Sequence, residues 1–273
     1  MSACTNSSSS VSGETTADQE EKEDTNKAKE TKKEEQEKKE AEKEKEIAEE
    51  KARAAAIAKE NAEPKYKINQ NNWSVDPLNE SVNEKVVLLT FDDAPDNYAV
   101  DMAKTLKKLD VDAIFFVNGI YLESPEGKEA LKKIYDMGFL IGNHTYSHAY
   151  LPELSKEEQR KEIEKVSEMV EEIIGEKPKF FRAPNGANTD FTKEIADEQG
   201  MILMNWSYGY DWHEEYSSKA AITDIMLHTN LLGSGSNLLM HDREWTSKAL
   251  PDIVSGLRDQ GYEIVDPHLI ETK

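Results

Sequence analysis

From residue 85 onwards, short runs of apolar residues alternate with amphipathic stretches of helical length. The first run, Val86-Val87-Leu88-Leu89-Thr90-Phe91, is almost continuously apolar and has no polar face. A strand of this kind is buried on both sides, as strands are in a parallel sheet that helices cover. The alternation therefore predicts an α/β fold with a parallel sheet.

This pattern predicts seven strands and six helices. The strands are expected at residues 86–91, 113–117, 139–142, 179–182, 201–205, 237–241 and 262–265. The helices are expected at residues 97–109, 128–137, 155–174, 190–199, 217–230 and 245–260. Such a sheet forms either a (β/α) barrel with fewer than eight units or an open doubly wound sheet, and the strand count does not separate the two.

Ionisable residues follow the expected strands at their C-terminal ends. They are Asp92 and Asp93, His144 and His148, Arg182, Asp211, and His241. Active sites of parallel α/β folds are built at that edge of the sheet. We therefore expect one site there, made from five separate segments.

Taken singly, these residues have simpler explanations. An Asp-Asp pair after a strand is usually a turn or a helix cap. His241 could be a buried histidine with a hydrogen-bond partner, and Arg182 could pair with a surface acid. Taken together, two histidines and one carboxylate are a standard set of metal ligands that leaves positions open for water and substrate. His144 and His148 are four residues apart, which is one helical turn, a spacing that lets both imidazoles reach one metal ion.

The five segments resemble the ordered motifs of the polysaccharide deacetylase (NodB-homology) carbohydrate esterases. The matching motifs are Thr90-Phe91-Asp92-Asp93, His144-Thr145-Tyr146-Ser147-His148, Arg182-Ala183-Pro184, Asp211-Trp212 and Leu239-Met240-His241. The resemblance covers about residues 85–268. It implies a distorted (β/α)₇ barrel, which agrees with the strand pattern.

The resemblance also implies a role for each position. Asp93, His144 and His148 would bind Zn²⁺, Co²⁺ or another divalent ion, and Asp92 would be the general base, oriented by Arg182. His241 would be the general acid, with Asp211 setting its orientation and pKa, while Leu239 and Trp212 would form the wall for the acetyl methyl group. The main-chain N–H at Asn185 would help to stabilise the oxyanion.

Two positions depart from the family pattern. Ala94 follows the aspartate pair where the family usually has glycine, so its Cβ is expected to narrow the groove or shift the turn. Asn185 stands where the family often has tyrosine; the N–H donor is kept and the aromatic packing is lost. All the ionisable residues are present, which favours an active enzyme.

The chain is expected to have three parts, a Ser/Thr-rich linker (1–19), a Glu/Lys/Ala-rich stalk (20–63) and the catalytic domain (64–273). Residues 1–63 contain no aromatic residue and cannot bury enough apolar surface to offset the entropy of ordering, so they are expected to be disordered or a single solvated helix. They hold 18 acidic and 12 basic residues, a charge of −6, which leaves −15 of the total −21 for the domain. That charge disfavours nucleic acid as a partner.

Ser2-Ala3-Cys4 resembles the end of a bacterial lipoprotein signal, in which the cysteine is lipidated. A lipid on Cys4 would be the chain's only link to a membrane and would place the domain outside the cell, at the bacterial surface. We expect a deacetylase that acts on N-acetylglucosamine units of a polysaccharide near that surface, namely peptidoglycan. The alternatives are an O-acetyl esterase of the same fold and an inactive module that binds metal and glycan at the wall.

Overall fold

The computed structural model describes residues 63–272. The predicted linker, the lipidation site Cys4 and nearly all of the predicted stalk lie outside the described residues. No helix among the described residues has the length and apolarity needed to cross a bilayer.

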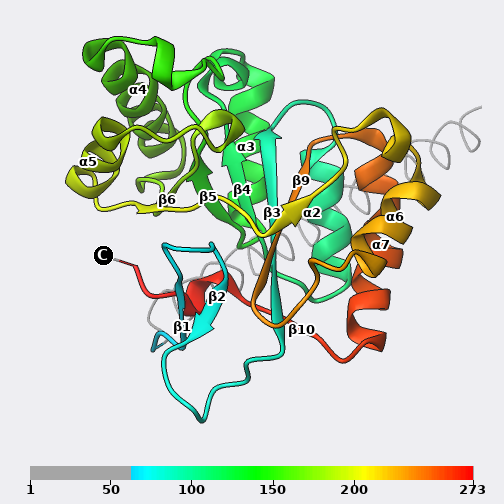
Figure 1. Ribbon diagram of the computed structural model, residues 1–273. Helices are drawn as coiled ribbons and strands as arrows, with labels where there is room; N and C mark the ends of the chain where they lie inside the picture. Colours follow the sequence, from blue (N-terminus) through cyan, green and yellow to red (C-terminus); the bar gives the residue numbers. More distant parts are fainter. Residues whose placement is uncertain (1–62, 273) are drawn as a thin grey trace, which may run out of the picture. The chain divides into compact units, whose positions relative to one another are not determined.

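Eight parallel strands form one curled sheet around β3 (Figure 1). Their bounds are β3 Val86–Ala94, β4 Ile114–Val117, β5 Leu140–Asn143, β6 Phe180–Phe181, β7 Ile202–Leu203, β8 Tyr208–Gly209, β9 Ser236–His241 and β10 Glu263–Ile264. The order is β7-β6-β5-β4-β3-β9-β8, with β10 paired to the start of β3. Within the described chain this path ends at β7 and β8, so the barrel is not closed by backbone hydrogen bonds.

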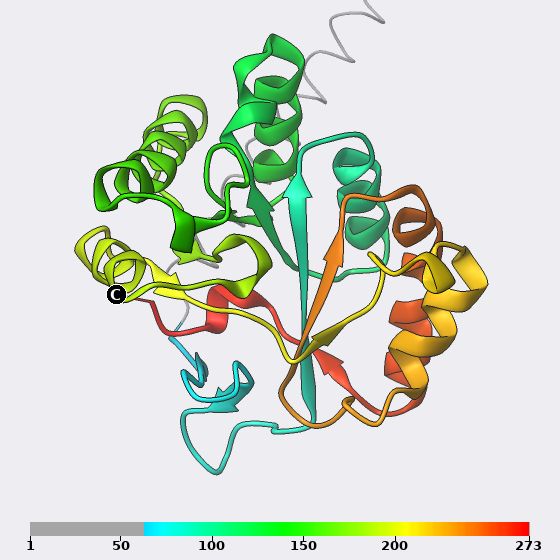
Figure 2. The same ribbon diagram turned by 45° about the horizontal axis from the view of Figure 1, so that its top comes forward.

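The side chains of β3 alternate between two apolar cores, as the period of a strand requires. Val87, Leu89 and Phe91 belong to the cluster shared with the helices. Val86 and Leu88 belong to a second cluster on the inner side of the curled sheet. Both faces are therefore buried, which explains why the run lacks a polar face. Figure 2 shows the helices arranged around the outside of the strands, which is the arrangement of a barrel and not of a doubly wound sheet.

The helices match the predicted ones with shifted ends. They are α2 Ala99–Lys108, α3 Pro125–Asp136, α4 Lys156–Ile174, α5 Asp190–Glu198, α6 Lys219–His228 and α7 Glu244–Asp259, with short 3₁₀ turns at η1 Gly119–Glu123, η2 Leu151–Glu153, η3 Pro184–Gly186, η4 Glu214–Tyr216 and η5 Pro267–Leu269. α3 begins three residues before its predicted start because Ser124 caps it by accepting a hydrogen bond from the Gly127 N–H, and Pro125 suits the first position.

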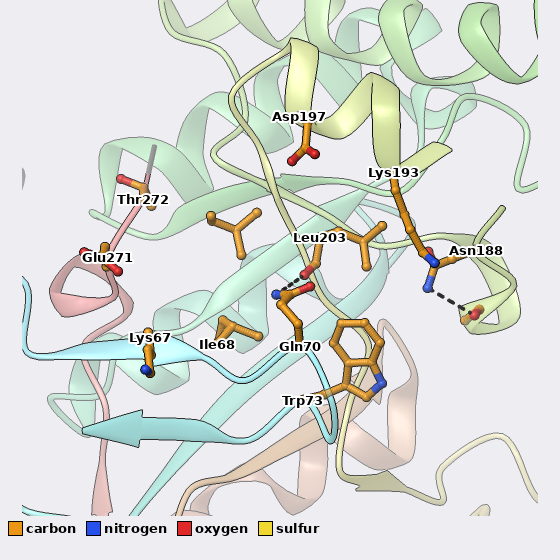
Figure 3. Close-up of a pocket in the computed structure, with 12 residues that line it drawn as sticks. Lys67, Ile68, Gln70, Trp73, Asn188, Lys193, Asp197, Leu203, Glu271 and Thr272 are labelled. Carbon is orange, nitrogen blue, oxygen red and sulfur yellow. Dashed lines mark hydrogen bonds between the residues drawn. The ribbon is translucent and has the colours of Figure 1, made fainter. Parts of the chain in front are cut away.

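A short antiparallel hairpin, β1 (Tyr66–Ile68) and β2 (Val75–Pro77), was not predicted from the sequence. Tyr66, Ile68 and Val75 complete the inner core. In the turn between these two strands, Gln70 donates a hydrogen bond to the carbonyl of Leu203 on the edge strand β7 (3.0 Å; Figure 3). A cavity of about 810 Å³ lies there, and none of its lining residues is a predicted site residue.

Candidate active site

The three predicted metal ligands converge from two strands. Asp93 stands near the end of β3, and His144 and His148 lie in the loop after β5. Asp93 Oδ1 lies 3.6 Å from His148 Nε2 and 3.9 Å from His144 Nε2. One ligand atom from each residue lies within 4.8 Å of the other two, and no other group of this kind was found among the described residues. Carboxylate oxygen and imidazole nitrogen are the donors that Zn²⁺ binds in open sites, so these residues fit a divalent metal.

The two histidines reach the same point from a loop and not from a helix. Thr145 and His148 have φ angles of 69° and 57°, in the left-handed region that only a few per cent of non-glycine residues adopt. Asp93 (60°) and Asn185 (56°) share this conformation, so four of the six such residues in the described chain belong to a site motif or directly follow one. Strained backbone of this kind concentrates at functional sites.

Buried polar contacts hold the histidine loop in this conformation. The Asn118 side chain donates to the carbonyls of His144 and Thr145 (2.6 and 3.2 Å), and the Thr145 N–H donates to Asn143 Oδ1 (2.9 Å). His144 Nδ1 lies 2.8 Å from the carbonyl of Arg182, so Nδ1 carries the proton and Nε2 is free to bind a metal. Burial lowers the pKa of His144 and outweighs the nearby carboxylates, which favours the neutral, ligating form.

The Asp92 carboxylate is buried against Arg182, as predicted. Arg182 Nη1 donates to Asp92 Oδ1 at 2.7 Å and to Thr90 Oγ1 at 2.9 Å, and the guanidinium lies 4.2 Å from the ring centre of Phe116. Burial by itself would raise the pKa of Asp92, but the charges of Arg182, His144 and His241 hold it below its usual value. The carboxylate is therefore ionised and able to accept a proton.

His241 lies directly beside Asp92, because these two residues are register partners on β9 and β3. Asp211 Oδ1 lies 2.7 Å from His241 Nδ1, and Oδ2 accepts from the His241 main-chain N–H (2.6 Å) and from Thr246 Oγ1 (2.6 Å). Burial by itself would lower the pKa of His241, but the hydrogen bond and charge of Asp211 and the charges of the aspartate pair raise it above its usual value. Nε2 is the ring nitrogen left for a substrate.

Trp212 and Leu239 both lie close to Gly209 of β8. The Trp212 ring centre is 5.4 Å from that of His241, and the side chain is 45% exposed. A Cβ added to Gly209 would come within 2.8 Å of the Trp212 ring and 3.0 Å of Leu239 Cβ. The lack of a side chain at Gly209 therefore leaves room for the indole beside Leu239, a role that the sequence analysis missed.

The two residues that depart from the family pattern, Ala94 and Asn185, lie in different surroundings. Ala94 is completely buried and belongs to the core cluster shared with the helices, so its Cβ packs into that core. Asn185 is exposed, and its main-chain N–H makes no hydrogen bond to another main-chain group of residues 63–272. Asparagine tolerates the left-handed conformation better than tyrosine does.

Two further residues that the sequence analysis did not assign follow His241 directly. The buried carboxylate of Asp242 accepts from the N–H groups of Asp96 and Asn97 (2.7 and 3.1 Å) and from that of Tyr98, at the start of α2. Arg243 Nη2 donates to Asp93 Oδ2 at 3.0 Å. These contacts join residues about 150 apart in the chain, so no local pattern could have revealed them.

Comparison with known proteins places this site in a family. The sequence model of the family described as polysaccharide deacetylase matches residues 79–204. A peptidoglycan-N-acetylglucosamine deacetylase of Bacillus cereus is 32% identical over 201 residues, which are 70% of this chain and 70% of that relative. The chain belongs to the polysaccharide deacetylase family.

One further relative and two solved structures resemble this chain over different shares of their own length. The peptidoglycan-N-acetylmuramic acid deacetylase PdaC of Bacillus subtilis is 33% identical over 201 residues, which are 72% of this chain but 40% of PdaC. The Bc1960 peptidoglycan N-acetylglucosamine deacetylase has a TM-score of 0.63 at 31% identity and covers 70% of this chain and 90% of its own. A CE4 family pseudoenzyme from Bacillus anthracis has a TM-score of 0.61 at 30% identity, and the match covers 67% of this chain and 63% of the pseudoenzyme. These likenesses confirm the predicted barrel.

Proposed function

We propose that this chain is a metal-dependent hydrolase that removes N-acetyl groups from N-acetylglucosamine units of peptidoglycan. One observation carries the proposal. Asp92 and His241 are register partners beside the three-ligand cluster, and each is held by its own ionic partner, Arg182 or Asp211. The names of the bacterial relatives support peptidoglycan as the polymer.

Asp93, His144 and His148 would hold the metal, with Zn²⁺ favoured and Co²⁺ a possible substitute. A divalent ion bound there would polarise the acetamide carbonyl and lower the pKa of a coordinated water. The main-chain N–H of Asn185 would add a hydrogen bond to the developing oxyanion.

The buried carboxylate of Asp92 would accept a proton from the attacking water as the new C–O bond forms at the acetyl carbon. His241 would then donate a proton from Nε2 to the sugar nitrogen as the C–N bond breaks, so that acetate and a free amine leave. Opposite tasks require opposite protonation states. The lowered pKa of Asp92 and the raised pKa of His241 supply them. Trp212 and Leu239 would contact the acetyl methyl group.

Acetate release is the test of this function. The purified protein would be treated with a chelator, reloaded with Zn²⁺ and offered N-acetylglucosamine oligomers, peptidoglycan with intact N-acetylmuramic acid, and O-acetylated xylan. We expect release from the first two substrates that depends on metal and is lost in Asp92→Asn. Release from xylan alone would favour the O-acetyl esterase, and release without metal would contradict the proposal.

The alternative function, an inactive metal- and glycan-binding module, has one observation in its favour, the likeness to a pseudoenzyme. Against it stands the complete set of ionisable residues, because binding alone requires neither Asp92 nor His241. Metal-dependent glycan binding without acetate from any substrate would support this alternative.

Attachment to the bacterial surface through a lipid on Cys4 is a separate proposal. It is supported by the Ser2-Ala3-Cys4 sequence alone. The test is to express the chain behind a complete lipoprotein signal in a bacterium and to fractionate the cells. The protein with Cys4 should be found with membranes, and the Cys4→Ala variant should be released. Equal partition of the two proteins would contradict the anchor.

A further inference from the structure

Arg243 is the second arginine that contacts the aspartate pair at the end of β3. Arg182 contacts Asp92, and Arg243 Nη2 donates to Asp93 Oδ2 at 3.0 Å. Each aspartate thus has its own guanidinium partner. The Arg182 side chain is completely buried, whereas that of Arg243 is 33% exposed at the rim of the site.

The two carboxylate oxygens of Asp93 face different groups. Oδ1 faces the imidazoles, 3.6 Å from His148 Nε2 and 3.9 Å from His144 Nε2. Oδ2 is occupied by Arg243. A carboxylate held in this way presents one oxygen, not two, to a cation between the imidazoles.

Arg243 is fixed relative to Asp93 by its own neighbours. Its main-chain N–H donates to the carbonyl of His241 (2.8 Å), and its Nη1 donates to the carbonyl of Asp242 (3.2 Å). The Asp242 N–H donates to the carbonyl of Asp92 (3.1 Å). The guanidinium is therefore held against the same stretch of chain that carries the metal ligand.

We propose that Arg243 is a positioning residue for the metal centre, orienting Asp93 so that Oδ1 alone ligates the ion. This inference rests on the metal site of the proposed function but not on the substrate. Hydrogen-bond partners of metal ligands typically contribute about 10–100-fold to metal affinity. The positive charge of Arg243 acts in the opposite direction, because it repels a cation. Removing Arg243 therefore weakens metal binding if its orientation of Asp93 dominates, and strengthens metal binding if its charge repulsion dominates.

The experiment is a titration of chelator-treated protein with Zn²⁺, and with Co²⁺, whose visible absorption reports its coordination. Arg243→Met removes the donor and the charge at similar length, and Arg243→Lys keeps both. Arg258→Met is the control: it removes the same charge near the other end of α7, the helix that begins directly after Arg243, roughly 20 Å along the helix axis. We expect Arg243→Met to bind both ions about 10–100-fold more weakly with an altered Co²⁺ spectrum. Arg243→Lys should restore most of the affinity, and Arg258→Met should match the parent.

Unchanged or tighter metal binding by Arg243→Met, or a loss that lysine does not recover, would overturn the proposal. The thermal midpoint of the metal-free proteins separates positioning from folding, because a positioning role leaves this midpoint close to that of the parent. Arg243→Gln, with a shorter donor, repeats the comparison if the methionine variant does not fold. No substrate enters the titration, so a protein that binds metal as expected but releases no acetate would refute only the proposed function.

Discussion

The carboxylate of Asp211 holds His241 at two points, with Oδ1 2.7 Å from the ring Nδ1 and Oδ2 2.6 Å from the main-chain nitrogen. The side chain of Asp211 is completely buried, so its charge acts on the imidazole with little screening by water. This pair determines the protonation state of the proposed general acid.

Asp211→Asn should move the alkaline limb of the pH profile of kcat/KM to lower pH. The acid must carry a proton, and activity falls as the pH rises through the pKa of His241. Asp211 raises the pKa of His241, so replacing its carboxylate by a neutral amide lowers this pKa. The decline in activity then begins at a lower pH. The maximal rate should also fall, by about 10²-fold. An alkaline limb that stays in place would contradict the role of Asp211.

Asp92→Asn should lower the rate of acetate release by about 10²–10⁴-fold, the usual contribution of a general base. The amide has nearly the same shape as the carboxylate but cannot take up the proton. The metal content should stay at the level of the parent, because Asp93, His144 and His148 are unchanged. If metal is lost together with activity, Asp92 serves the metal site and not proton transfer.

Gly209→Ala should damage the acetyl pocket. The new Cβ would lie 2.4 Å from the Leu239 carbonyl oxygen and 2.8 Å from the Trp212 ring, so the strand or the indole must shift. Overpacking of this kind costs about 1–3 kcal/mol of unfolding free energy. Gly233→Ala is the matched control, because its added Cβ meets nothing within 4 Å. Urea unfolding and KM for an N-acetylglucosamine oligomer would be measured on both variants; equal values for the two would refute the prediction.

Asp242→Ala should destabilise the protein more than Asp242→Asn. The buried carboxylate accepts from the N–H groups of Asp96, Asn97 and Tyr98, and alanine leaves these donors without their acceptor. A hydrogen bond to a charged group contributes about 1.5–3 kcal/mol to the free energy of unfolding, and the exposure of Asp96 and Asn97 reduces the loss because water can replace the carboxylate there. Asparagine keeps one acceptor oxygen and should recover part of the loss. Urea unfolding of the two variants measures the difference, and equal midpoints would show that Asp242 does not hold this loop.

The fold was predictable where the apolar signal was long. β3 occupies nine residues with buried side chains on both faces, and the prediction for residues 86–91 found it. β6, β7 and β10 have two residues each and were predicted two to three residues too long, at 179–182, 201–205 and 262–265, whereas the two-residue strand β8 was not predicted at all. The hairpin of β1 and β2 was missed for the same reason, because three-residue strands give no periodicity to detect.

The site was predictable where one residue type implied one task. Metal chemistry and the family motifs predicted that Asp93, His144 and His148 converge. The spacing of the two histidines also predicted that both reach one ion, but the backbone conformation that brings them together differs from the expected one. Their four-residue separation suggested a helical turn, whereas the structure uses left-handed residues at Thr145 and His148. Backbone conformation of this kind depends on contacts such as those of Asn118, which the local sequence does not reveal.

Three successive residues, His241, Asp242 and Arg243, contact three different parts of the site. Inserting or deleting one residue at the end of β9 would shift all three out of register together. Length variation among relatives should therefore be absent at this point and should accumulate in segments that make no such contacts, such as the turn around Gly233.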